Sequence, residues 1–494
     1  MHMGWIADFF RLAWGLLYWN SRKTAYRLRL KHGRGRCPCQ HPSDSGRAIE
    51  TGCAAMIHWN DPARFRRLCP LLQQIDSGAW RCSVNRTEVR PFWGRAFAFY
   101  GASVVIVYLV ATFSVFAFMR NVGYPVTYPG VLWPPAWKKF TAIRTDFFLS
   151  QYRAAAQAGD TQAALMSLST AYNLDPQNYA AGRQLAQAWQ IGQPGLSNQI
   201  YRRLLADHPS EAEATAQVWF RALLARGDFR EVEKLAVKRI NAAPAQSAAW
   251  LNAFLFANRR TGDASLRRRL AETPSLPPAA RFLLPLADSL QGAPPGRQRT
   301  VLISAAAGAG DSLSFFHVCR ELLSRGLANE TLEWLERRAG LLGPRDVVPL
   351  RLDALAMLGW NSTLRSEVEN LLVTDPDPVV VELLSAHLIR HPDAAVRAMV
   401  FARLDRTPLP STPASYSAYL SLFCAAGVGE DIERLRWTPA RIKAFVQADF
   451  RSLDVIGEGL LEGNRRRIEN YLPALQPLPL EVTYALFEHY APAS

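Results

Sequence analysis

Apolar side chains recur at helical spacing through most of this chain. Near its middle, for example, Leu165, Leu168 and Tyr172 lie three or four residues apart, a period that places them on one face of a helix. Similar stretches, separated by short turns rich in Pro and Gly, continue from residue 281 toward residue 494. No strand-like alternation of useful length accompanies them, so the pattern predicts an all-α chain.

A fixed period punctuates the helical stretches before residue 280. Three glycines are each followed 17 residues later by a proline: Gly159 by Pro176, Gly192 by Pro209, and Gly227 by Pro244. Gly adopts the left-handed conformation that ends a helix at low cost, and the residue before Pro is pushed out of the helical region. A period of 33 to 35 residues is typical of stacked helix pairs, which usually form binding surfaces.

On these positions the chain resembles the tetratricopeptide (TPR) repeat family. The first unit fits the family pattern best, with Gly159, Ala164, Leu168, Ala171 and Pro176. The third unit departs from the pattern at its small-residue positions. The resemblance implies a right-handed helical-repeat solenoid.

We expect TPR-like repeats over residues 140–280 and divergent α-helical repeats over residues 281–494. The resemblance also implies that the first helix of each pair lines a concave groove. The matching positions are polar and basic, and would suit an acidic or extended partner segment. They are Arg153, Gln157, Tyr179, Trp189, Gln190, Gln217, Arg221, Asn252, Arg259 and Arg260. The alternative is that these side chains belong to ordinary solvated helix faces.

Residues 96–119 form a run of 24 residues without a charge. About 20 apolar residues cross the hydrocarbon core of a bilayer, so we expect a single transmembrane helix here. Arginines are more frequent on its N-terminal side, and this bias predicts a cytoplasmic N-terminus with the repeats periplasmic or otherwise outside the cytoplasm. The residue usage suggests a bacterial chain, and hence the inner membrane.

The segments that flank this run have their own patterns. Residues 1–31 combine an apolar helical face with a following basic run, which predicts an amphipathic helix lying on anionic lipid. The alternative is a helix packed against the transmembrane span or against a partner subunit. Residues 120–139 contain four prolines and several aromatic residues, and predict a stiff spacer without regular helix.

Five of the seven cysteines lie in the first 82 residues, all of them in a basic module over residues 32–95. Thiolate and imidazole groups can close a tetrahedral zinc site, and a cytoplasmic location disfavours disulfides. The preferred ligands are Cys37, Cys39, Cys53 and Cys69, with Cys82 or His41 as substitutes. Because the spacing lacks matched Cys-x-x-Cys pairs, inert or redox-active thiols and an iron–sulfur cluster stay open. Cys319 and Cys424 lie in apolar helical stripes and are expected to be buried core thiols.

The remaining features bear on the class of function. The chain has a net charge of +15, of which residues 1–95 carry +10; the adjacent membrane segment explains this basicity, so no nucleic-acid partner is expected. No phosphate-binding loop, zinc-protease motif or nucleophile elbow occurs, and we expect no enzyme. The sequence predicts a membrane-anchored scaffold that binds other membrane or envelope proteins. The alternative is a transmembrane sensor that couples the cysteine module to partner binding outside.

Overall fold

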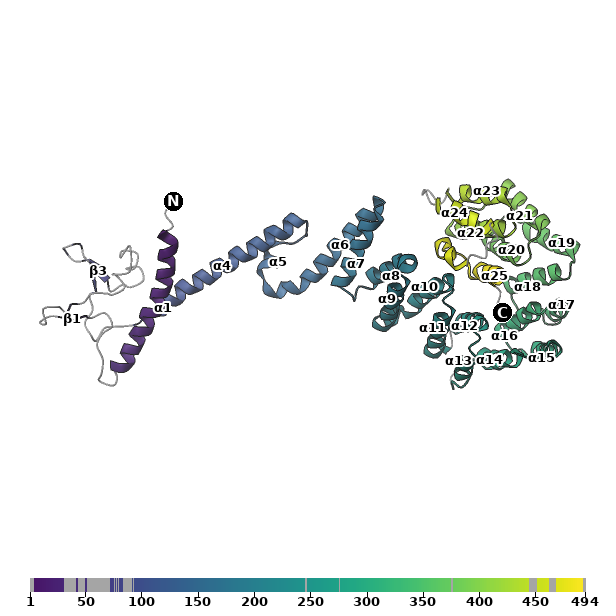
Figure 1. Ribbon diagram of the computed structural model, residues 1–494, viewed down its shortest axis with the longest axis horizontal. Helices are drawn as coiled ribbons and strands as arrows, with labels where there is room; N and C mark the ends of the chain where they lie inside the picture. The colour runs from purple at the N-terminus through teal and green to yellow at the C-terminus, as the bar shows by residue number, and fades with distance from the viewer. Residues whose placement is uncertain are drawn as a thin grey trace. The chain divides into compact units, whose positions relative to one another are not determined.

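The structure is a computed structural model of the 494-residue chain (Figure 1). It describes residues 4–30, 41–42, 49–50, 72–74, 76, 78, 80–82, 91, 93–244, 247–274, 276–374, 376–443, 451–461 and 468–491. These residues are predominantly helical, which confirms the prediction of an all-α chain. The chain divides into two compact units, Met1–Gln151 and Tyr152–Ser494, which are described separately.

The first unit begins with a long helix followed by two pairs of short strands. Its first elements are α1 (Gly4–Leu30), β1 (His41–Pro42), β2 (Ile49–Glu50), β3 (Leu72–Gln74) and β4 (Trp80–Cys82). The strands pair antiparallel, β1 with β2 and β3 with β4. Strands of two or three residues are too short to change the fold class.

Helix α4 (Trp93–Val122) covers the apolar run and extends it by three residues at each end. Its most apolar window of 18 residues has a mean hydropathy of 2.3. By length and composition it is the one helix in the described part of the chain that could cross a membrane. Its apolar side chains are mostly exposed, for example Val107 at 67% and Phe118 at 68%, which is the opposite of a helix buried in a soluble core.

Helix α1 packs against the first half of α4. The Trp93 indole Nε1 donates a hydrogen bond of 2.8 Å to Thr24 Oγ1, and the Tyr100 hydroxyl donates to the Ala13 carbonyl. Leu16 and Tyr26 are buried on the same helix. The sequence left such packing open as the alternative to a helix lying on lipid, and the contacts with α4 favour it.

The segment after α4, where the sequence predicts a stiff spacer without regular helix over residues 120–139, contains short helical turns and folds back along that helix. It contains α5 (Tyr128–Leu132) and the 3₁₀ helix η2 (Pro134–Lys139), each with Pro in its first turn. The Tyr128 ring contacts the rings of Phe113 and Phe116 at 6.0 and 5.6 Å, and the Tyr108 hydroxyl donates to the Leu132 carbonyl. The aromatic residues therefore supply a packing surface, and the prolines start helical turns, where their missing N–H is no loss. Helix α6 (Phe140–Gln157) follows.

The second unit is a succession of helices joined by short turns. Its elements are α7 (Thr161–Leu174), α8 (Tyr179–Gly192), α9 (Pro194–Asp207), η3 (Pro209–Glu211), α10 (Ala212–Ala225), α11 (Phe229–Ala242), α12 (Ala248–Thr261), α13 (Ala264–Ala271), α14 (Pro278–Leu290), α15 (Pro295–Gly308), α16 (Ser312–Ser324), α17 (Ala328–Arg337), α18 (Pro344–Met357), α19 (Asn361–Leu372), α20 (Pro378–Arg390), α21 (Ala394–Arg406), α22 (Pro413–Val428), α23 (Ile432–Lys443), α24 (Arg451–Leu461), η5 (Ile468–Asn470), η6 (Leu472–Leu475) and α25 (Leu480–Tyr490). From α8 to α23 they follow one another in pairs, α8 with α9, α10 with α11, and so on. The change from TPR-like to divergent repeats that the sequence places near residue 280 lies within this unit.

The glycine turns of the first repeats are mostly as predicted. Gly159 and Gly227 have positive φ angles of 76° and 69° and follow the ends of α6 and α10. Gly262, at the end of α12, has a positive φ angle of 68° as well. Gly192 differs, because it is the last residue of α8 and the next helix begins at Pro194. Here a proline at the first helical position makes the turn, so no left-handed glycine is needed.

The same turn continues beyond the region where the sequence showed a period. Gly292, Gly326 and Gly359 also have positive φ angles, of 71°, 77° and 69°. Their spacings of 34 and 33 residues match the earlier repeats. The amide of Leu327 donates to the Leu322 carbonyl at 3.0 Å, the bond that closes a helix at a glycine of this kind. The repeat therefore extends further than the Gly–Pro spacing indicates.

Close packing holds neighbouring helices together. Phe254, Phe315 and Phe401 are fully buried, and so are Cys319 and Cys424, which confirms that these two thiols belong to the core. Each large buried side chain contributes roughly 1.5–3 kcal/mol relative to an exposed one.

Helix α25 lies on the inner side of the curve that the preceding helices follow (Figure 1). It packs along α20, and its Tyr484 ring lies 4.0 Å from the ring of Phe256 on α12. The Phe487 ring lies 5.2 Å from that of Phe229 at the start of α11. The C-terminal helix thus connects repeats that are far apart in the sequence.

Candidate functional site

A cavity of about 740 Å³ lies on the inner side of the second unit, beside α25. Its walls come mainly from α12, α16, α18, α20 and α25. The first four of these are each the first helix of a pair, the position that the TPR resemblance assigns to a groove. Cavities of this size are typical of ligand sites in proteins.

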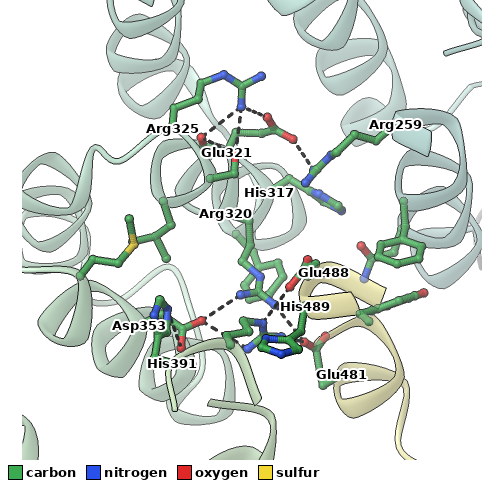
Figure 2. A pocket seen from close by; sticks show the side chains of 18 of the residues that line it. Arg259, His317, Arg320, Glu321, Arg325, Asp353, His391, Glu481, Glu488 and His489 are labelled. Atoms are coloured by element: carbon green, nitrogen blue, oxygen red, sulfur yellow. Dashed lines mark hydrogen bonds and ion pairs between the residues drawn. The ribbon is translucent and has the colours of Figure 1, made fainter. Parts of the chain in front are cut away.

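The lining of the cavity is strongly charged (Figure 2). Its charged side chains are Arg259, Arg260, Arg320, Arg325 and Arg390 with Glu321, Asp353, Glu481 and Glu488, accompanied by His317, His391 and His489. With neutral histidines, the described lining therefore carries five positive and four negative charges. How these groups are paired decides what the cavity can bind.

Asp353 on α18 is the most buried acid of the cavity, with 2% of its surface exposed. Its carboxylate lies 2.7 Å from His387 Nδ1 and accepts hydrogen bonds from Arg320 and Arg390 at 3.1 and 3.3 Å. Burial by itself would raise the pKa of Asp353, but Arg390, His387 and Arg320 outweigh it and hold the pKa well below its ordinary value. Asp353 therefore stays ionised and serves as a fixed structural anion.

Arg390 at the end of α20 joins this cluster to the C-terminal helix. Its guanidinium donates to Glu488 at 2.9 Å and to Glu481 at 3.2 Å, as well as to Asp353. Burial opposes its charge, but the three acids outweigh burial and raise the pKa of Arg390. Three helices, α18, α20 and α25, thus meet at one side chain.

A second group of ion pairs lies around Glu321 on α16. Arg259 and Arg325 both pair with the Glu321 carboxylate, and Figure 2 shows the two arginines on either side of it. Burial raises the pKa of Glu321, yet Arg259 and Arg325 outweigh burial and lower it. Nearby, burial and then Arg259 lower the pKa of His317 to about 4, so its imidazole is neutral at pH 7. The Nε2 atom of His317 is buried and has no hydrogen-bond partner among the described residues.

Arg260 at the end of α12 is placed differently from the other four arginines. Its guanidinium carbon lies 3.8 Å from the centre of the Phe256 ring and 5.3 Å from that of Phe229. No acid lies within ion-pair distance of it in the described part of the chain. Burial lowers the pKa of Arg260 to about 10, with Arg259 adding to the effect and Glu488 opposing it. The side chain is therefore a charged group on an aromatic surface without a direct counter-ion.

Three of the ten groove residues predicted from the sequence line this cavity: Asn252, Arg259 and Arg260. The other seven do not line it. They are Arg153, Gln157, Tyr179, Trp189, Gln190, Gln217 and Arg221.

Some of these seven have structural roles between helices. The Tyr179 hydroxyl lies 3.0 Å from Thr215 Oγ1, and Gln190 donates to the Tyr201 hydroxyl at 2.8 Å. Arg153 and Arg221 are exposed, which leaves them accessible to a partner.

The predicted metal ligands Cys37, Cys39, Cys53 and Cys69 lie outside the described residues, so zinc binding stays a prediction. Within the described ranges, no group of three or more His, Cys, Asp or Glu side chains is arranged to hold a metal ion.

Sequence reasoning missed most of the cavity because its residues come from the later helices. One signal was present: Asp353 interrupts the apolar stretch Leu350 to Met357, and an acid on an apolar helix face is either paired or functional. Another residue of the cavity lining, His391, directly precedes Pro392; a residue in that position is typical of a helix end and gives no sign of a binding site.

In comparisons with known proteins, no protein-family model and no curated protein matches this chain. The described residues define its class: a helical protein with one apolar helix long enough to cross a membrane and a charged cavity within its second unit.

Proposed function

We propose that this chain is a single-pass membrane scaffold whose TPR-like array binds other membrane or envelope proteins. The observation that carries this proposal is the presence, in one chain, of an exposed apolar helix of 30 residues and a series of helix pairs with a charged inner cavity. The array would hold an acidic or extended segment of a partner.

The membrane assignment is supported by the surface of the first unit. A helix of 30 residues is about 45 Å long at 1.5 Å per residue, enough to cross a hydrocarbon core of about 30 Å. Phe10 and Trp14 on α1 are exposed at 66% and 68% although α1 packs beside α4. Lipid would cover both apolar surfaces, as it covers the outer face of any membrane-embedded helix pair.

The orientation and location rest on charge. Residues 1–95 carry a net charge of +10 and the run over residues 96–119 carries none. By the positive-inside rule, the N-terminus is cytoplasmic and the array lies outside the cytoplasm. The residue usage, which suggests a bacterial chain, would make this membrane the inner one and the location of the array periplasmic.

The repeat assignment is supported by the turns and by the position of the cavity. Left-handed glycines end most first helices in this range, with Gly192 as the exception, and TPR-like units carry a glycine at this turn. They are Gly159, Gly227, Gly262, Gly292, Gly326 and Gly359. A binding role is favoured over catalysis, because four of the five cavity arginines are engaged with the four acids.

Partner capture tests the scaffold proposal. The full chain is crosslinked in its membrane, purified and analysed by mass spectrometry, comparing wild type with the double variant Arg153→Glu and Arg221→Glu. Both arginines are exposed predicted groove residues, and exposed Lys238 on α11, changed to Glu, is the matched control. We expect one defined envelope protein that the double variant loses and the control retains. Capture of the same proteins by all three forms, or of none, would show the groove assignment to be wrong.

Membrane insertion is tested separately. Val107→Arg together with Val110→Arg places two charges at the middle of α4, each costing about 2.5–3.5 kcal/mol in a bilayer. We expect alkaline carbonate to extract this variant from membranes but not a Met166→Arg control, since Met166 is an exposed apolar residue of the second unit. Equal retention of both variants would contradict a membrane-spanning α4.

A further inference from the structure

We propose that the cavity of the second unit contains a carboxylate-binding site centred on Arg260. This inference deepens the proposed function, since a carboxylate of a partner would be the group recognised, but the test below does not need a partner.

The hydrogen-bond donors of Arg260 are incompletely satisfied. A guanidinium has five N–H donors, and among the described residues this one makes a single long hydrogen bond, of 3.4 Å from Nη1 to the Phe256 carbonyl. Its Nε atom is buried without a partner among the described residues. A buried donor without an acceptor is costly, so an oxygen ligand at this position would remove a penalty that the free protein bears.

The ion pairs of the lining leave one positive charge unpaired among the described residues. Glu321 is paired with Arg259 and Arg325, while Asp353, Glu481 and Glu488 are paired with Arg320 and Arg390. Among the described lining residues, Arg260 is the charge left over. One surplus positive charge suits one carboxylate. A phosphate dianion would add a second negative charge close to acids that are already present, so the lining favours carboxylate over phosphate.

A second side chain of the cavity has a buried polar atom without a partner among the described residues, independently of Arg260. His317 also lines the cavity, is 7% exposed, and has a buried Nε2 without a partner in the described part of the chain. Neutral imidazole carries one donor and one acceptor nitrogen. In the tautomer with the proton on Nε2, His317 offers a neutral hydrogen bond to a ligand in the same cavity.

The side chains around Arg260 suit the planar geometry of a carboxylate. Phe256 stacks on the guanidinium and fixes its plane, and the fork of a guanidinium can donate two parallel hydrogen bonds to a carboxylate. Tyr484 adds an aromatic surface 4.0 Å from the Phe256 ring.

The chain's own acids do not fill this role. Glu488 is the acid whose charge acts most on Arg260, but its carboxylate is bonded to Arg390 at 2.9 Å. It is also carried by α25, in which Val482 to Phe487 are all buried. If α25 moved so that Glu488 could pair with Arg260, these six buried side chains would be exposed. Helix α25 therefore forms a permanent wall of the site, and Glu488 does not occupy the position of the ligand.

Binding to the full chain in lipid nanodiscs tests the proposal by titration calorimetry. The probes are glutarate, tetraglutamate and inorganic phosphate, and the variants are Arg260→Gln and a control, Arg269→Gln. Arg269 is an exposed arginine on the next helix and does not line the cavity. We expect a carboxylate probe to bind wild type and the control equally, and to bind Arg260→Gln about 10–100-fold more weakly, as for loss of charged hydrogen bonds. Arg260→Lys keeps the charge without the planar fork, and we expect it to fold like wild type and bind about tenfold more weakly.

The probes also separate the possible sources of the carboxylate. Binding of glutarate supports a site open to free small acids, whereas binding of tetraglutamate alone supports a site for an acidic protein segment. Absence of carboxylate binding, preference for phosphate, or equal loss in the Arg269 control would overturn the proposal. If a partner is captured but no carboxylate probe binds, the scaffold proposal is supported and the carboxylate site is wrong. If a carboxylate probe binds but no partner is captured, the carboxylate site is supported and the scaffold proposal is wrong.

Discussion

Arg390 should be among the most sensitive positions of the second unit. It has 8% of its side chain exposed and pairs with Asp353, Glu481 and Glu488. In Arg390→Met, Asp353 keeps His387 and Arg320, and Glu481 keeps Arg320. Glu488 is the acid left without an ion-pair partner in the described part of the chain.

The ion pairs that remain in Arg390→Met determine how much stability the variant loses. Removing one member of a buried ion pair costs about 3–5 kcal/mol, whereas an exposed pair contributes about 0–1 kcal/mol. The Glu488 side chain is 35% exposed, and water will screen part of its charge. We therefore expect Arg390→Met to lower the free energy of unfolding by about 3 kcal/mol at pH 7, at the low end of the buried range.

The pH dependence supplies a second test. Burial opposes the charge of Glu488, but the arginines, Arg390 first, outweigh burial and lower its pKa. A carboxylate of lowered pKa stabilises the fold above its unfolded pKa, and this contribution is lost as the pH falls. The difference between wild type and Arg390→Met should therefore shrink as the pH drops below about 4.3, the ordinary Glu value.

Urea unfolding of the full chain in detergent, followed by circular dichroism, measures these differences. Arg351→Met is the matched control, because Arg351 and Glu367 form a pair at 2.8 Å with side chains 46% and 33% exposed. A cycle with Glu488→Gln isolates the coupling of Arg390 to Glu488. If Arg390→Met costs no more than the control, or if the cycle shows no coupling, the assignment of Arg390 as a buried link is refuted.

Two further predictions concern stability. Burial lowers the pKa of His317 to about 4, so between pH 6.5 and 4 the unfolded chain binds a proton that the folded chain does not. As the pH decreases through this range, the free energy of unfolding should decrease by up to about 3 kcal/mol. Urea unfolding at several pH values should show this slope in wild type and not in His317→Gln, and an unchanged slope in the variant would contradict the prediction. A Cβ on Gly182 would lie 2.8 Å from Tyr172 Cε2 and 2.9 Å from Leu204 Cδ2, whereas one on Gly192 would meet nothing within 4 Å. Gly182→Ala should therefore lower the free energy of unfolding by about 1–3 kcal/mol, whereas Gly192→Ala should leave it unchanged. Thermal unfolding measures the difference, and equal melting temperatures of the two variants would contradict the close helix contact at Gly182.

The glycine turns between the helices were largely readable from the sequence because turns are local. Glycine adopts at low cost the left-handed conformation that ends a helix, and Gly159 and Gly227 both show the expected positive φ. The later glycines were missed because the Gly–Pro pairing was required as the signal, whereas the turn itself needs only the glycine.

The cavity could be predicted only in part because its residues are brought together over long distances. Asn252, Arg259 and Arg260 were found from their repeat positions, since they share one helix. Arg320 and Glu481 bond across 161 residues, and Arg390 and Glu488 across 98. Hydrophobic periodicity says which face of a helix is buried but not which distant helix covers it.

The position of α25 changes how the second unit should come apart. In a simple helical array each repeat contacts only its neighbours, so the ends fray and unfolding proceeds repeat by repeat. Here one helix contacts Phe256 on α12 and Arg390 on α20, so neither region can open without breaking contacts of the other. The intervening helices should exchange their amide hydrogens as one cooperative block, with slow exchange reaching well into the array. On heating or during proteolysis, the second unit should then unfold as a single cooperative domain.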